Sequence, residues 1–327
     1  MLQNRRQFVA TGSFALFAAT LRAQAKLCPF RLAVIADEIS SDFEHACSVA
    51  SKDFGLSWIE VRDVNGKNIT KLDEQETAEA KKILAKYNLK VTDAGTPLFK
   101  SDFPGAPLSK DSPNKDAAKI PADLSKQFEL LDAAIAAARN FGTDRIRCFD
   151  FWRLDDPAPF RKDIYAALDK GATIAGKAGM KLVLENEMAC NTGSGKEAAV
   201  TLAAVPNPSL MLNWDPGNSG SFAGDVPFPD DYNALPKNRI GHCHVKSVSR
   251  NDPGSKKTYQ WEPVGKGLID WTGQLAALKR DGYKYGVSLE THWHSGPGTT
   301  QAEIKESSTR ISMQGLKDCL KAAGIDC

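Results

Sequence analysis

Four short apolar runs in the second half of the chain each end in residues that can bind a divalent metal ion. The runs KLVLENE, LMLNWDPGN, IGHCHVKS and YGVSLETHWH carry Glu185, Asp215, His244 and Glu290. Three carboxylates and one imidazole suit an ion such as Mn, Mg, Co or Zn, with water or substrate oxygens completing its shell. One such residue alone is more often a polar cap on a strand. Four together at similar intervals predict a single metal site.

The spacing of these residues indicates how they meet. Roughly 30 residues separate Glu185 from Asp215 and Asp215 from His244, which is the length of one strand, one helix and two loops. The interval from His244 to Glu290 is longer and predicts the same unit with an inserted loop. In a parallel α/β barrel the carboxyl ends of all strands face one mouth, where active sites are built. We therefore expect the four side chains to converge there.

The rest of the chain continues the alternation of strand and helix. Apolar runs predict four earlier strands, and helical periodicity predicts a helix after each strand. No GxGxxG or GxxxxGK[ST] motif opens a helix, which argues against a nucleotide-binding open sheet. We therefore predict a single (β/α)8 TIM barrel, with no second domain. The expected strands are 30–35, 58–62, 89–92 and 145–149, and the expected helices are 42–54, 73–87, 122–140, 159–177, 196–204, 229–235, 270–281 and 301–323, with a polar loop through Pro121.

Further polar residues flank the predicted ligands. His242 and His244 lie two apart, so both can face the barrel interior. We expect His244, nearer the mouth, to be the ligand and His242, deeper, to contact substrate or support the site. Lys246 would bind a substrate hydroxyl or acidic group, unless it is a solvated lysine at the rim. Glu60 shares one side of its strand with Arg62 and is a further candidate for substrate binding.

Four tryptophans fall at or near predicted strand ends or in loops. Aromatic rings offer flat apolar surfaces to a ligand, so we expect about half of them to line a pocket. Trp214 is the one best explained as barrel core. The four are Trp152, Trp214, Trp261 and Trp293.

These motifs resemble the xylose isomerase-like TIM barrel superfamily, and within it the sugar phosphate isomerase/epimerase family. ENE, DPGN, HxHVK and SLETH carry the resemblance, and IADEIS, IEVR and residues 267–271 extend it along the mature chain. In ketose 3-epimerases of this superfamily the residues matching Glu185, Asp215, His244 and Glu290 bind one divalent metal ion. The resemblance thus implies that Glu185 and Glu290 act as acid and base on opposite faces of a keto-sugar, while the metal stabilises the enediolate.

Two more positions follow from the resemblance. Arg250 matches a substrate-contacting arginine of the epimerases. Asn218 stands where those enzymes place a histidine, three residues after the Asp, and is a candidate substrate contact. That departure bears on epimerase activity more than on metal binding.

The expected function is therefore that of a metal-dependent sugar isomerase or epimerase acting by proton transfer next to a carbonyl. A lyase or dehydratase of a keto-sugar or keto-glycoside, resembling inosose dehydratase, is the alternative. A nuclease resembling endonuclease IV needs three zinc ions and a basic groove, whereas the chain has five histidines and a net charge of +2. A non-catalytic sugar-binding barrel predicts an incomplete ligand set. We expect a small sugar as partner, and neither nucleic acid nor a membrane span.

The first 25 residues are typical of a twin-arginine export signal. Arg5 and Arg6 precede an uncharged run from Val9 to Leu21, and Ala23-Gln24-Ala25 is a small-x-small cleavage site. The alternative is an ordinary amphipathic first helix. We expect a leader over 1–25, a barrel over 26–327, and a periplasmic or exported product.

Seven cysteines form no CxxC or other zinc-ribbon spacing. An oxidising destination permits disulfides, and Cys319 with Cys327 is one candidate pair. The odd count leaves at least one free thiol. Cys148 and Cys243 lie inside predicted strands and are expected to be buried apolar residues.

Overall fold

Eight parallel strands form a closed barrel in a computed structural model of the chain, which describes residues 28–114, 122–252, 254–255 and 257–327. Each neighbouring pair in the sheet is parallel, and a parallel bridge between Ile35 and Glu60 joins the first strand to the second and closes the ring. The prediction of one (β/α)8 barrel is confirmed, while the predicted leader lies outside the described residues. In order around the ring the strands are β1 (Arg31–Val34), β12 (Gly286–Leu289), β9 (Ile240–Val245), β8 (Leu210–Trp214), β7 (Lys181–Glu185), β6 (Arg145–Cys148), β5 (Lys90–Leu98) and β2 (Trp58–Val61).

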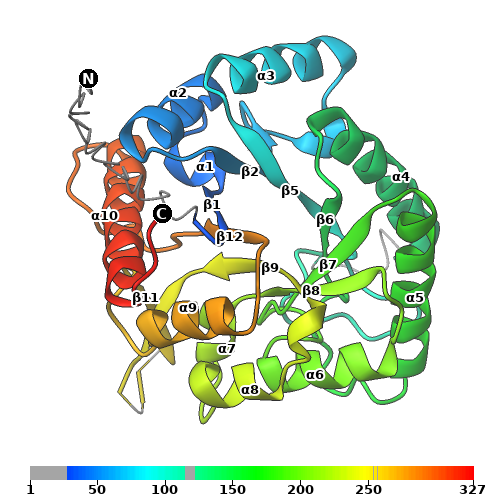
Figure 1. Cartoon of the computed structure of the whole chain (residues 1–327). Helices are drawn as coiled ribbons and strands as arrows, with labels where there is room; N and C mark the ends of the chain where they lie inside the picture. The colour runs from blue at the N-terminus through cyan, green and yellow to red at the C-terminus, as the bar shows by residue number, and fades with distance from the viewer. Residues whose placement is uncertain (1–27, 115–121, 253, 256) are drawn as a thin grey trace, which may run out of the picture.

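Helices surround this ring and follow the strands in sequence, as Figure 1 shows. Three of them begin with a capping box, in which an Asp, Ser or Thr side chain and a glutamate three residues later satisfy the free amides of the first turn. None of the helices in the described residues is long and apolar enough to cross a membrane. The longer helices are α2 (Phe43–Ser48), α3 (Glu74–Lys86), α4 (Leu124–Phe141), α5 (Arg161–Lys177), α6 (Gly195–Ala204), α9 (Trp271–Arg280) and α10 (Gln301–Ala322).

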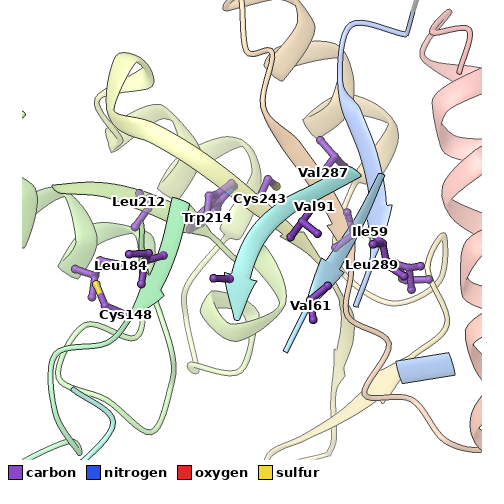
Figure 2. Close-up of a cluster of buried hydrophobic side chains, with 14 of the residues drawn as sticks. Ile59, Val61, Val91, Cys148, Leu184, Leu212, Trp214, Cys243, Val287 and Leu289 are labelled. Carbon is purple, nitrogen blue, oxygen red and sulfur yellow. The ribbon is translucent and has the colours of Figure 1, made fainter. Parts of the chain in front are cut away.

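The side chains of the barrel strands alternate between two environments. Figure 2 shows a cluster of apolar residues contributed by β2, β5, β6, β7, β8, β9 and β12, among them Ile59, Leu184 and Cys243. Their neighbours in the strands, such as Glu60, Glu185 and His244, are equally buried but polar. Successive residues of a strand point to opposite faces. Hence the apolar set packs outside the ring and the polar set fills its interior.

Several elements differ from the sequence prediction. The third strand, β5, runs to Leu98 rather than Thr92, and residues 115–121 of the expected polar loop lie outside the described residues. The inserted loop after the seventh strand is a hairpin of β10 (Ser247–Arg250) and β11 (Tyr259–Glu262). The segment expected as helix 229–235 is a π-helical turn over 227–231 followed by α8 (Tyr232–Ala234). Three short elements were not predicted, namely α1 (Ala36–Ile39), α7 (Pro216–Gly220) and the hairpin of β3 (Asp63–Val64) and β4 (Lys67–Asn68).

The disulfide differs from the candidate pair. Cys28 bonds to Cys327, whereas Cys319 is a free thiol. Cys319 lies within α10, with its sulfur 3.6 Å from the position that a Cβ on Gly265 would take. The chain beyond α10 instead returns to the start of β1, which brings the two Cα atoms within 4.4 Å. Cys148 and Cys243 are fully buried, as expected.

Candidate functional site

The four predicted metal ligands meet at the carboxyl ends of four strands. Glu185 is the last residue of β7, Asp215 follows β8, His244 lies near the end of β9 and Glu290 follows β12. One ligand atom from each of these buried residues lies within 4.8 Å of every other. Residues up to 105 positions apart therefore converge because parallel strands end at the same mouth.

Asp215 is fixed by the start of α7. Its Oδ1 accepts a hydrogen bond from Asn218 N (3.0 Å), and Pro216 occupies the first helical position. Asn186 holds the Asp215 backbone by accepting from its N–H and donating to its C=O, both at 2.8 Å. The Asn218 amide donates to Glu185 Oε1 (3.2 Å) and to Asp215 Oδ2 (3.1 Å). Asn218 thus contacts two of the four predicted ligands.

The two nitrogens of His244 face different partners. Nδ1 lies 3.3 Å from Glu290 and 3.5 Å from Glu185. Nε2 lies 3.2 Å from both carboxylate oxygens of Glu60, which comes from β2 across the barrel. His242 approaches the same carboxylate, with Nε2 3.0 Å from Glu60 Oε2. This arrangement, a carboxylate behind a histidine, orients the ring and raises its basicity as a ligand.

Gly286 makes room for that histidine pair. A Cβ at this position in β12 would lie 2.5 Å from the ring of His242, whose strand is paired directly with β12. Only a glycine leaves room for the imidazole against the neighbouring strand. The backbone of β12 therefore helps to set the depth of His242, below His244.

Cations neutralise much of the carboxylate charge. Lys246 Nζ donates to Glu290 Oε2 (2.6 Å) and lies 2.9 Å from Asp215 Oδ2. Its side chain is 1% exposed, so Lys246 is a buried residue of the cluster and not a solvated lysine at the rim. Arg147 Nη1 lies 3.4 Å from Glu185 Oε2 and 3.9 Å from Glu290 Oε1.

These neighbours control the ionisation of the cluster. Burial alone would raise the pKa of Glu185, but His244 and Arg147 together outweigh it and the pKa falls to about 2. Burial likewise opposes the charge on His244, yet Glu60, Glu185 and Glu290 raise its pKa well above the usual value. For Asp215, desolvation prevails over Lys246 and raises the pKa to about 6.

The residues present fit a divalent cation. Three carboxylates and an imidazole nitrogen supply oxygen and nitrogen donors in one buried place. In the described chain, Glu185 Oε2 and His244 Nδ1 are buried with no hydrogen-bond partner. A buried polar atom without a partner is costly, and a cation held between the two would satisfy both.

Not all of the predicted site residues join this cluster. Arg250 is exposed at the end of β10, where its guanidinium donates to the backbone oxygens of Phe222 (2.9 Å) and Asp225. Because the guanidinium of Arg250 is hydrogen-bonded to these carbonyls, it does not contact the four predicted ligands. Trp214 is fully buried and donates to Gln274, so it belongs to the core. Trp261 and Trp293 line a cleft beside the cluster.

Sequence reasoning missed several charged residues of the site. Arg62 donates to Asp37, Glu38 and Glu290 and so joins the ends of three strands. Arg147 lies inside the apolar strand β6, and Asp93 is fully buried in β5. The signal was present: a charged residue at an alternate position of a buried strand must face a polar interior.

Comparison with known proteins is consistent with this arrangement. A family model described as xylose isomerase-like TIM barrel matches residues 49–319. No curated protein matches the chain. Many solved structures do, at identities that show the fold alone.

Three of these structures illustrate the range. The probable 3-DHS dehydratase AsbF from Bacillus anthracis has 17% identity and a TM-score of 0.65, over 88% of this chain and 98% of that chain. The IOLI protein with a bound zinc atom has 15% identity and a TM-score of 0.65, over 90% and 98%. D-allulose 3-epimerase from Methylomonas sp. has 18% identity and a TM-score of 0.62, over 90% and 98%.

Proposed function

The chain belongs to the xylose isomerase-like TIM barrel family, and from that premise we propose that it is a divalent-metal-dependent isomerase or epimerase of a sugar or keto-sugar. The observation that carries the proposal is the meeting of Glu185, Asp215, His244 and Glu290 within 4.8 Å. A structural relative that binds zinc and another named as a 3-epimerase support it.

Glu185, Asp215, His244 and Glu290 would hold the metal ion, in a setting prepared by Glu60 and Asn218. When bound, a divalent ion supplies a Lewis acid that makes a proton next to a carbonyl more acidic. Zn, Mn, Mg and Co all accept this mixture of oxygen and nitrogen donors.

The protein groups would move the proton. Glu185 is ionised at neutral pH, and its Oε2 has no hydrogen-bond partner in the described chain, so it is the candidate base. Glu290 follows β12, three strands away from β7 around the ring, and shares a short hydrogen bond with the Lys246 ammonium. This pair is the candidate acid on the other face. Arg147 lies between the two glutamates and would stabilise negative charge that develops on the substrate.

A lyase or dehydratase is the second candidate, and the same residues would serve it. Glu185 would take the proton from the carbon next to the carbonyl, and the Lys246–Glu290 pair would protonate a group leaving from the adjacent carbon, so that a C=C bond forms between these two carbons. A probable dehydratase has the same fold, and this supports the lyase as a second candidate. Product mass distinguishes the two reactions. An isomerisation product has the mass of the substrate, whereas elimination gives two products that are each lighter than the substrate.

The test is turnover of a panel of keto-sugars by protein loaded with each candidate metal. We expect Glu290→Gln and Glu185→Gln to lower turnover by about 10²–10⁴-fold while keeping the fold, because each loses general acid–base catalysis. Glu187→Gln is the matched control, since Glu187 lies two residues from Glu185 but pairs with Lys100 outside the cluster. Full activity of Glu290→Gln would rule out the two-glutamate mechanism.

Metal content is an independent test. We expect about one divalent ion per chain in protein purified without added metal or chelator, lost in Asp215→Ala and in His244→Ala. Three zinc ions would favour a nuclease. No metal, with none taken up on titration, would favour a non-catalytic sugar-binding barrel.

We also propose that the protein is exported through the twin-arginine pathway to the periplasm. Two observations support this. One is the twin-arginine motif at Arg5 and Arg6. The other is a disulfide that joins Cys28, just after the expected cleavage site, to Cys327. Replacing both arginines by lysine should leave uncleaved protein in the cytoplasm, as detected by fractionation and N-terminal sequencing. Unchanged export of that variant would contradict the proposal.

A further inference from the structure

A cleft of about 770 Å³ opens beside the candidate metal cluster. One wall is the β10–β11 hairpin and the other is the loop that follows β12, so the longer interval between His244 and Glu290 supplies much of its surface. Its volume lies in the upper part of the range for ligand pockets. The residues that carry the argument are Tyr259, Gln260, Trp261, Glu262, His292 and Trp293.

Half-buried aromatic rings line this cleft. Trp261 packs against Tyr259 with ring centroids 5.1 Å apart, and against His292 at 5.3 Å. Trp261, Trp293 and Tyr259 all keep part of their surface accessible. Rings held in place by neighbours present a flat apolar surface at little entropic cost, which suits the C–H face of a sugar.

Hydrogen-bonding groups alternate with these rings. Gln260, Thr258, Asn251 and Ser295 offer amide and hydroxyl groups along the same cleft. The one carboxylate among the described lining residues, Glu262, accepts from Ser249 (2.6 Å) and Gln260 (2.8 Å). Lys257 is the single lysine or arginine among the described lining residues, and a mostly uncharged polar lining suits a neutral polyol better than a phosphate.

Two residues that line the cleft, Trp261 and His292, lie against residues of the cluster. Lys246 Nζ lies 5.3 Å from the centroid of the Trp261 ring while it donates to Glu290. On the other wall His292 Nε2 lies 3.3 Å from Glu290 Oε1. A ligand with one ring at the cluster can therefore continue directly onto Trp261.

We propose that the cleft is a subsite for a second sugar ring, so that the substrate is a glycoside whose keto-sugar ring lies at the metal cluster. This rests on the proposed function for the position of the first ring. A single sugar ring at the cluster would leave the aromatic cleft without a role, whereas a disaccharide occupies both places.

Calorimetric binding to the metal-loaded full chain tests the subsite without relying on turnover. The probes are glucose disaccharides of each linkage, compared with the methyl glucosides. We expect the best disaccharide to bind at least about tenfold more tightly than the best methyl glucoside. Trp261→Ala should abolish that difference and leave the affinity for the methyl glucoside unchanged.

Two variants control for loss of packing. Trp261→Phe keeps a ring and should retain most of the preference. Trp58→Ala removes a half-buried tryptophan at the opposite end of the barrel, at the start of β2, and should retain all of it. Equal affinities for both classes of probe, no binding of any disaccharide, or an equal loss of both in Trp261→Ala would overturn the subsite.

The outcomes separate this inference from the proposed reaction. A preference for disaccharides without turnover of any keto-sugar or keto-glycoside would contradict the proposed reaction and support the subsite. Turnover of keto-monosaccharides without disaccharide preference would remove the subsite alone.

Discussion

Lys246 places a positive charge where a metal ion would also be attracted. Its ammonium lies 2.6 Å from Glu290 Oε2 and 2.9 Å from Asp215 Oδ2, two of the predicted ligands. Its own pKa is held well above the usual value, because the carboxylates of Asp215 and Glu290 outweigh the cost of burial. Lysine and metal ion therefore compete for the same oxygens.

We accordingly expect Lys246→Met to bind Mn²⁺ roughly tenfold more tightly, because removing a nearby positive charge favours a second cation. Isothermal titration of the metal-free protein measures this. Lys100→Met is the matched control, since Lys100 pairs with Glu187 instead of the cluster and should leave the affinity unchanged. Weaker binding by Lys246→Met would show that the lysine chiefly orients the carboxylates.

Asp150 gives a pH-dependent prediction at a residue away from the cluster. Desolvation raises the pKa of this fully buried carboxyl to about 6, although Thr192 donates two hydrogen bonds to it. A carboxyl whose pKa is higher in the folded than in the unfolded chain lowers the free energy of unfolding as pH rises between the two values. The penalty begins near pH 4, is complete above pH 6 and amounts to at most about 3 kcal/mol.

Asp150→Asn should therefore be more stable than the native chain at pH 7, by about 1–3 kcal/mol, and equally stable at pH 4. Urea unfolding at the two pH values checks this. Asp155→Asn, an exposed neighbour, should change neither value. An equal effect of Asp150→Asn at both pH values would mean that packing, not ionisation, is responsible.

At the scale of elements, the alternation along each strand links the core to the site. Ile59, Leu184 and Cys243 belong to the apolar set outside the ring (Figure 2). The residue that follows each of them, Glu60, Glu185 and His244, faces the inside. A shift of one residue in any strand would exchange the two sets. The outer core therefore fixes the register on which the site depends.

Gly286→Ala tests that dependence. The added methyl group would collide with His242, and we expect a loss of about 1–3 kcal/mol in the free energy of unfolding together with weaker metal binding, because Glu60 would lose its place behind His244. Chemical denaturation and metal titration measure the two effects. In a His242→Ala background the substitution should cost much less. Equal costs in both backgrounds would exclude the clash as the cause.

The order of strands and helices could be predicted from the sequence, and the short or cross-ring features could not. Each β/α unit shows its own periodicity, so the eight strands were placed within a few residues, β5 excepted. The helices α1 and α7 span four and five residues, too few for a periodic signal. The four predicted ligands could be brought together from sequence alone, because the carboxyl ends of all the strands lie at one mouth of the barrel. The alternation within β6 indicates that Arg147 faces the interior, but the carboxylates that Arg147 and Arg62 contact lie on other strands, and no local pattern records those partners.

At the scale of the whole molecule, one covalent bond joins the first and last described segments. Cys28 and Cys327 are 299 residues apart, and sequence could not assign this pair because seven cysteines allow many. Cross-linking distant residues limits the unfolded chain and stabilises the native state. The bond holds the end of the chain against the start of β1, the strand that closes the ring.

Reduction of this bond should lower the free energy of unfolding by about 2–5 kcal/mol. Cys327→Ser should reproduce the loss under oxidising conditions. The matched control is Cys319→Ser, a half-buried free thiol, which should respond to reduction as the native chain does. Insensitivity of the native protein to reductant would show that the pair contributes no stability.

The same disulfide closes nearly the whole described chain into a covalent loop, from Cys28 to Cys327. A protease that cuts once in any surface loop between the two cysteines opens this covalent loop without releasing a fragment, because the pieces stay tied at the termini. On a denaturing gel the nicked protein should migrate as one band without reductant and as two bands with it. A chain linked in this way would remain a single molecule after a first cut.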